Sequence, residues 1–143
     1  MKRGGGEPRR KKHSHAEPGQ HRRPATAVLD RLIAAFWASD TDAMRASFNF
    51  PHVRFHSSRV TTFPTPERFI LDLFRSTADA KEWARSVWDE RRVIHAGPDK
   101  VHVDTQFSRL RADGSSIASY RSIYIVPRVD GRRGIQRRSS FAA

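Results

Sequence analysis

The sequence predicts one α+β domain in which helices come first and a sheet of long antiparallel strands follows. Near the N-terminus apolar residues recur at three- and four-residue spacing, whereas the last third of the chain alternates apolar and polar residues. Two Asp-Gly pairs, Asp113-Gly114 and Asp130-Gly131, separate the last strands and favour hairpin turns, because glycine tolerates positive φ. A chain of 143 residues is long enough for one domain with one hydrophobic core.

The chain is expected to consist of a disordered basic tail at residues 1–24 and one folded domain at residues 25–143. The tail has no large apolar side chain after Met1, so it cannot bury enough surface to offset the entropy cost of ordering. It carries eight Lys or Arg and two Glu, which is half of the formal net charge of +12. A nucleic-acid-binding arm, an extension without function and upstream sequence from a wrongly chosen start all stay open for it.

Three helices are expected in the first half of the domain. The first covers residues 25–39, where Val28, Leu29 and Leu32 begin one apolar face. A second covers residues 41–48, after an N-cap at Asp40, and Pro51 ends it. The third starts after Thr65, with Pro66 in its first turn, and its apolar residues are Phe69, Ile70, Leu73 and Phe74.

The expected strands follow from alternation and from β-branched and aromatic residues. Two short strands surround Ser57-Ser58 within residues 52–62, and three or four longer ones follow at residues 83–95, 101–111, 117–128 and 132–141.

Composition and motifs exclude several classes of protein. Cysteine is absent, which excludes disulfides, thiolate catalysis and cysteine-based zinc sites. No apolar run reaches the roughly 20 residues that a membrane-spanning helix needs, and no secretory signal is visible. There is no P-loop, GxGxxG, GxSxG or zinc signature. We therefore expect a cytoplasmic protein without cofactor, metal ion or membrane contact.

The segment AVLDRLIAAFWASDTDAMRASF at residues 27–48 resembles the opening helices of the nuclear transport factor 2-like superfamily, and the strands joined by Asp-Gly turns resemble its closing sheet. The chain looks most similar to the small bacterial SnoaL-like members. The resemblance implies a cone-shaped α+β fold, with three helices packed on a curved, mostly antiparallel sheet around a pocket. It also implies a homodimer. It does not imply one activity, because this fold hosts several reactions and binding functions.

Ketosteroid isomerase, a relative by this resemblance, uses one Tyr and two Asp. The matching positions here fall on Leu32, on or beside Phe55, and near Ser122 to Tyr124. None of them supplies the carboxylate base and acid that the reaction requires, so the sequence disfavours this activity.

His52 is the candidate catalytic residue, as an acid or base on the first strand of the domain. His56 shares its face, because side chains on a strand alternate. His95 and His102 flank a turn and are expected at the surface. Asp104 is expected to point outward and to pair with an arginine.

Five further residues are candidates for binding a substrate at the wall of the pocket. Aromatic residues with a polar tip suit a mostly apolar pocket, and an arginine can hold a carboxylate through two hydrogen bonds. They are Trp88, Tyr120, Tyr124, Gln136 and Arg138.

The sequence predicts a protein that binds a small apolar or mixed-polarity molecule. Three alternatives stay open: a cofactor-free acid/base enzyme of the isomerase, cyclase, dehydratase or hydrolase type, a non-catalytic dimeric accessory domain, and a nucleic-acid binder through residues 1–24.

Overall fold

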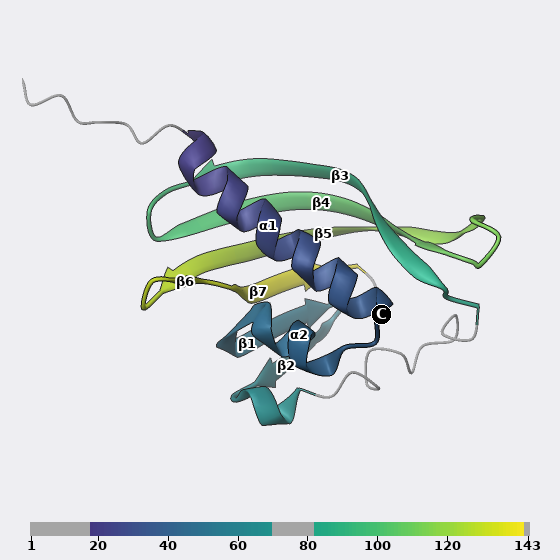
Figure 1. The fold of residues 1–143 in the computed structure, drawn as a ribbon, viewed down its shortest axis with the longest axis horizontal. Helices are drawn as coiled ribbons and strands as arrows, with labels where there is room; N and C mark the ends of the chain where they lie inside the picture. The colour runs from purple at the N-terminus through teal and green to yellow at the C-terminus, as the bar shows by residue number, and fades with distance from the viewer. Residues whose placement is uncertain (1–17, 70–81, 142–143) are drawn as a thin grey trace, which may run out of the picture.

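The computed structural model describes residues 18–69 and 82–141. Two helices open the described part of the chain, and strands make up most of the rest of it (Figure 1). The elements are α1 (Pro18–Trp37), α2 (Thr41–Ala46), β1 (Phe48–His56), β2 (Arg59–Phe63), the 3₁₀ turn η1 (Pro66–Arg68), β3 (Arg85–Ala96), β4 (Lys100–Leu110), β5 (Ser116–Val129), β6 (Arg132–Arg133) and β7 (Ile135–Ser140).

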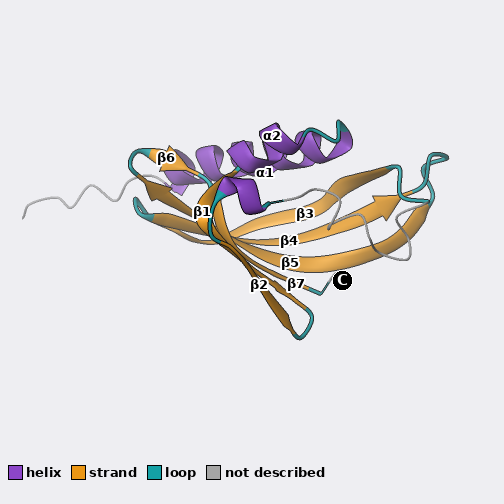
Figure 2. Cartoon of the chain, turned by 90° about the horizontal axis from the view of Figure 1, so that it is seen from below, coloured by secondary structure: helices purple, strands orange, loops and turns teal. Residues whose placement is uncertain are grey.

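The strands form one curved sheet in the order β2-β1-β7-β5-β4-β3, and β6 pairs with β5. Only β1 and β7 run parallel among these strands; the other pairs are antiparallel. Figure 2 shows that α1 and α2 cover one face of the sheet, while no helix of the described part lies on the opposite face. The expected order of helices and strands is confirmed.

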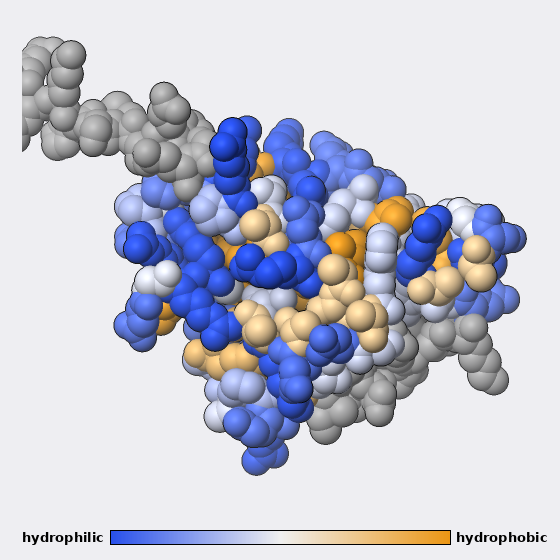
Figure 3. Space-filling view, in the orientation of Figure 1, coloured by the Kyte–Doolittle hydropathy of each residue, from blue (hydrophilic) through white to orange (hydrophobic). Residues whose placement is uncertain are grey.

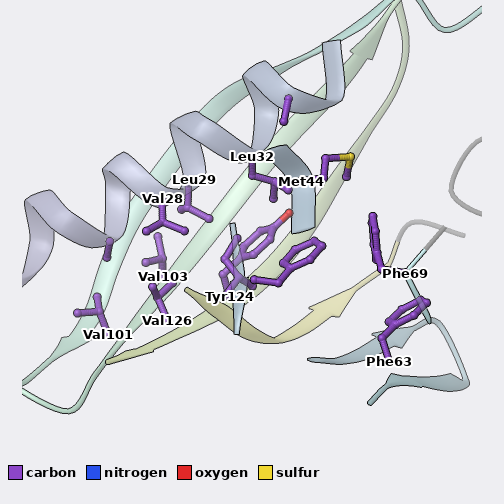
Figure 4. Packing of buried hydrophobic residues seen from close by; sticks show 14 residues of the cluster. Val28, Leu29, Leu32, Met44, Phe63, Phe69, Val101, Val103, Tyr124 and Val126 are labelled. Carbon is purple, nitrogen blue, oxygen red and sulfur yellow. The ribbon is translucent and has the colours of Figure 1, made fainter. Parts of the chain in front are cut away.

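The core lies between α1 and the long strands. Helical spacing turns Val28, Leu29 and Leu32 toward the sheet, where they meet Val103 on β4 and Tyr124 on β5 (Figure 4). These side chains are 0–8 % exposed. The inner face of β4 alternates as its sequence predicts, from Val101 onward.

The described residues do not show the three expected helices: one long helix and one short helix lie on the sheet in this part of the chain. Where the third was expected, the structure shows the single turn η1, and Phe69 that follows it is extended, with φ −84° and ψ 117°. Both Arg45 nitrogens Nε and Nη2 donate to the Phe69 carbonyl, which ties this backbone to α2 instead of to a helical turn. The remainder of the expected helix, residues 70–81, lies outside the described residues.

Two boundaries also differ from those expected. α1 begins at Pro18, not at residue 25, and continues through Pro24. The guanidinium of Arg133 on β6 donates to Nδ1 of His21, so a contact distant in sequence holds this early part of the helix. The expected tail is therefore helical from residue 18, and residues 1–17 lie outside the description.

The second helix ends at Ala46, because Phe48 already belongs to β1. Its predicted N-cap is confirmed: the Asp40 carboxylate accepts a hydrogen bond from the Ala43 amide at 3.0 Å. The Ile135 amide donates to the Ser47 carbonyl, which draws the chain toward β7 immediately after the helix.

No helix in the described part is both long and apolar enough to cross a membrane. The view onto the helices shows mostly hydrophilic side chains, with smaller apolar areas around the C-terminal half of α1 (Figure 3).

Candidate functional site

A pocket opens between the C-terminal half of α1, α2 and the concave face of the sheet. Its volume is about 60 Å³. A single buried water needs roughly 10–15 Å³ of such space, so the pocket has room for several non-hydrogen atoms. The described residues that line it are Leu32, Ile33, Phe36, Met44, Phe48, His52, Arg54, Trp83, Ser86, Trp88, Phe107, Arg109, Tyr124 and Arg138.

His52 forms part of the pocket wall on β1 and is only 1 % exposed. Its ring stacks on Phe48, with 4.2 Å between the ring centroids. Nδ1 lies 3.1 Å from the Ile135 carbonyl oxygen, which can only accept, so this nitrogen carries the proton. Burial lowers the pKa of His52 to about 4, and the charges of Arg138 and Arg54 add to the effect although the hydrogen bond to Ile135 opposes it. The imidazole is neutral at pH 7, and its basic nitrogen is Nε2.

Three arginines give the pocket its charge. Arg54 on β1 stands beside Arg138 on the parallel strand β7, and Arg138 stands beside Tyr124 on β5. Arg109 lies further along β4 and is 3 % exposed, while Arg54 is 8 % exposed. Burial and the charge of Arg138 lower the pKa of Arg54 to about 9. Arg54 and Arg138 thus place two positive charges on adjacent strands.

Aromatic rings hold two of these guanidinium groups in place. The Arg109 guanidinium carbon lies 4.2 Å from the centroid of Trp83 and 5.0 Å from that of Tyr120. That of Arg138 lies 5.3 Å from the ring centroid of Tyr124. Stacking of this kind stabilises a cation on the face of a ring and leaves the N–H donors at the edge of the guanidinium plane.

Some of the remaining polar groups in the wall already make hydrogen bonds within the protein, and others do not. The Ser86 hydroxyl accepts from Trp83 Nε1 at 2.9 Å, and the Ser86 carbonyl accepts from Trp37 Nε1 at 2.6 Å. In contrast, Trp88 Nε1 and Arg138 Nε are buried and make no hydrogen bond in the described structure. No Asp or Glu belongs to the described lining.

The structure brings together four of the six candidate residues from the sequence: His52, Trp88, Tyr124 and Arg138 line the pocket. Tyr120 does not reach the described lining; its ring packs on Arg109 and Phe107 instead. Gln136 is half-buried on β7, also outside the lining. The roles proposed for these residues remain predictions.

Other expected residues take structural positions. His56 shares the inner face of β1, but beyond the pocket, where its Nε2 bonds with Thr61 Oγ1 at 2.9 Å. Asp104 lies on the outer face between Arg92 and Arg121, at 3.5 and 3.8 Å, so the expected pairing with arginine is confirmed.

Sequence reasoning missed Arg54 and Arg109, although the signal was there. Arg54 lies two residues after His52, and Arg109 lies two residues after Phe107, so alternation places each on the same face as a recognised inward residue. Arginine is seldom buried, so residue type alone does not indicate an inward position for either.

In the described part of the chain, no three His, Asp or Glu side chains gather where they could hold a metal ion.

The model of a protein family described as NTF2-like protein (DUF6841) matches residues 22–136. The chain belongs to this NTF2-like family. The resemblance seen in the sequence is therefore confirmed. No curated protein matches the chain.

Solved structures of NTF2-like and cystatin-like folds are similar to this one. A protein of unknown function from Nostoc punctiforme has a TM-score of 0.67 and 11 % identity, covering 83 % of this chain and 88 % of that one. A putative aromatic ring hydroxylase from Novosphingobium aromaticivorans has a TM-score of 0.65 and 17 % identity, over 86 % and 89 %. A ketosteroid isomerase-like protein from Erwinia carotovora atroseptica has a TM-score of 0.61 and 14 % identity, over 82 % and 92 %. At these identities the likeness shows the fold alone.

Proposed function

We propose that this NTF2-like protein binds a small molecule of mixed polarity in the pocket between α1 and the sheet. One observation carries the proposal: apolar and aromatic walls surround a small group of polar side chains at the centre of the concave face. The apolar part of the ligand would lie against Leu32, Met44 and Phe107, and its polar part would contact His52, Arg54 and Arg138.

Native mass spectrometry of the purified protein, followed by denaturing release, tests the proposal. We expect a small molecule to stay bound to the wild type and to be lost from Leu32→Phe, which fills the pocket. Ile94→Phe adds the same volume at an exposed position of β3 and serves as the matched control. Equal ligand content in all three proteins would contradict the proposal.

A binding function without catalysis is favoured over an acid/base enzyme by two features of the wall. Its described lining has no carboxylate, and His52, with a pKa of about 4, is a weak base. If the protein does catalyse a proton transfer, His52 is the residue proposed to perform it. Then His52→Asn, which keeps a donor toward the Ile135 carbonyl, would abolish turnover of the identified ligand and retain its binding.

A nucleic-acid function of residues 1–24 remains an alternative proposal that rests on their charge alone. It requires binding to decline steeply with salt concentration and to disappear when Arg9, Arg10, Lys11 and Lys12 are replaced by glutamine. Binding that survives these replacements would exclude the basic block as the cause.

A further inference from the structure

We propose that the ligand carries an oxyanion, a carboxylate or a phosphate group, and that Arg138, Arg54 and Trp88 bind it. This inference rests on the proposed function, because it names the chemical class of the molecule in the same pocket. Four independent features of the wall support it.

The first feature is that the pocket offers hydrogen-bond donors and few acceptors. Arginine and tryptophan side chains only donate, and they are five of the polar residues in the described lining. The Ser86 oxygens are already engaged by indole donors. A ligand that complements this wall must therefore be rich in acceptors, as an oxyanion is.

The second feature is a pair of buried donors that the described protein does not satisfy. Arg138 Nε and Trp88 Nε1 both belong to pocket residues, and neither has a hydrogen-bond partner. A buried donor without an acceptor is costly. The two oxygens of a carboxylate, or the several oxygens of a phosphate, would give each of them an acceptor.

The third feature is that two neighbouring residues in the wall both carry a positive charge. Arg54 and Arg138 are cross-strand partners, and the charge of Arg138 contributes to lowering the pKa of Arg54. A bound anion would be attracted to both groups. Stacking on Tyr124 orients the Arg138 guanidinium beforehand, so less rotational freedom is lost on binding.

The fourth feature is the size and surface of the rest of the cavity. A volume of about 60 Å³ suits a ligand of few atoms, and the rings of Phe48, Trp88 and Phe107 suit a flat apolar body beside the anionic group. Benzoate and phenyl phosphate combine these properties and are suitable probes.

Calorimetric titration of the full-length protein with benzoate, phenyl phosphate, benzamide and benzylamine tests the inference, since these share one ring and differ in charge. We expect one of the two anions to bind at least about tenfold more tightly than benzamide, because hydrogen bonds to charged groups are the stronger ones. Benzylamine should not bind. Whichever anion binds more tightly identifies the oxyanion.

Two variants and one control locate the anion. Arg138→Met keeps a long side chain but removes the charge and the donors, so anion affinity should fall at least about tenfold while benzamide affinity stays unchanged. Trp88→Phe keeps a ring and removes Nε1, and should weaken the same anion. Arg137→Met changes the adjacent residue, which is exposed on β7, and should have no effect.

One further readout depends on charge and not on fold. In NMR titrations, benzoate should raise the pKa of His52, because the anion offsets the charges of Arg54 and Arg138 that lower it.

The outcomes separate this inference from the proposed function. If benzamide binds as tightly as benzoate, the pocket binds small molecules, but the inference that the ligand carries an oxyanion is wrong. If Arg137→Met weakens binding as much as Arg138→Met does, the anion binds at the surface and the inference is also wrong. If none of the four probes binds and nothing co-purifies, both the inference and the proposed function fail.

Discussion

His52 shows how its surroundings set the chemistry of a single residue. The ring is buried against Phe48, a backbone carbonyl fixes its proton on Nδ1, and two arginines stand nearby. Each arginine disfavours a second positive charge, so the imidazole stays neutral well below the ordinary pKa of 6.5. His52 can therefore accept a hydrogen bond at Nε2 but is poorly suited to take a proton.

Because of its lowered pKa, His52 should make the protein sensitive to acid. Below pH 6.5 the unfolded chain binds a proton at this residue, whereas the folded protein does not until about pH 4. Stability is therefore full above pH 6.5 and falls as the pH decreases through this window, by about 3 kcal/mol at pH 4 from this residue. Urea unfolding at several pH values between 4 and 7 measures the effect.

The matched variant is His52→Asn, whose amide can donate to the Ile135 carbonyl but does not titrate. Its free energy of unfolding should vary less between pH 7 and pH 4 than that of the wild type, by about the same 3 kcal/mol. An unchanged pH profile would mean that His52 is not the group responsible.

At the scale of elements, the parallel pairing of β1 and β7 builds the site. It places Arg54 beside Arg138 and brings Ile135 to His52, although these residues are far apart in sequence. A register shift between Phe48 and Val53 accompanies the pairing. The loop between β6 and β7 enters this region at Gly134, where the backbones come very close.

Gly134→Ala should destabilise the protein, because a Cβ at this position would lie 2.8 Å from the Asn49 backbone nitrogen. Such a contact forces the two strands apart, and overpacking of this kind typically costs about 1–3 kcal/mol. Thermal unfolding measures the change. Gly97→Ala is the control, since the nearest atom to its Cβ, the Lys100 carbonyl oxygen, would lie 3.9 Å away. Equal melting temperatures for both variants would contradict the close approach.

At the scale of the whole molecule, the outer face of the sheet carries exposed apolar side chains. Val60, Phe55 and Ile123 are 57 %, 50 % and 41 % exposed. Strand register places them in one row with Ser139, across β2, β1, β7 and β5. Helices cover only the opposite face in the described structure (Figure 2). The homodimer implied by the sequence resemblance remains a prediction, and this row is the surface where we expect it.

Analytical ultracentrifugation tests the dimer. The wild type should sediment as a dimer, and the double variant Phe55→Lys with Ile123→Lys as a monomer, because two buried charges without partners would disfavour the interface. Ala27→Lys introduces a lysine at an exposed position of α1 and should stay dimeric. A wild-type monomer, or a dimeric double variant, would contradict this surface.

Local sequence patterns were sufficient to predict the order of elements, the long strands and much of the core. Periodicity identified the inward residues of α1, and alternation identified those of β4, because both are local properties of the chain. The capping of α2 by Asp40 was equally readable, since a cap involves residues only three positions apart. The same alternation would also have identified Arg54 and Arg109 as inward.

How these residues assemble depends on contacts between distant parts of the chain. The start of α1 depends on Arg133, the end of α2 on Ile135, and the extended backbone at Phe69 on Arg45. The charge of the pocket likewise arises from arginines on three strands, β1, β4 and β7, which are distant in sequence. Pairing between distant strands decides which residues become neighbours in the pocket, and their burial then sets their pKa values. Neither the neighbours nor the pKa values could be derived from local patterns.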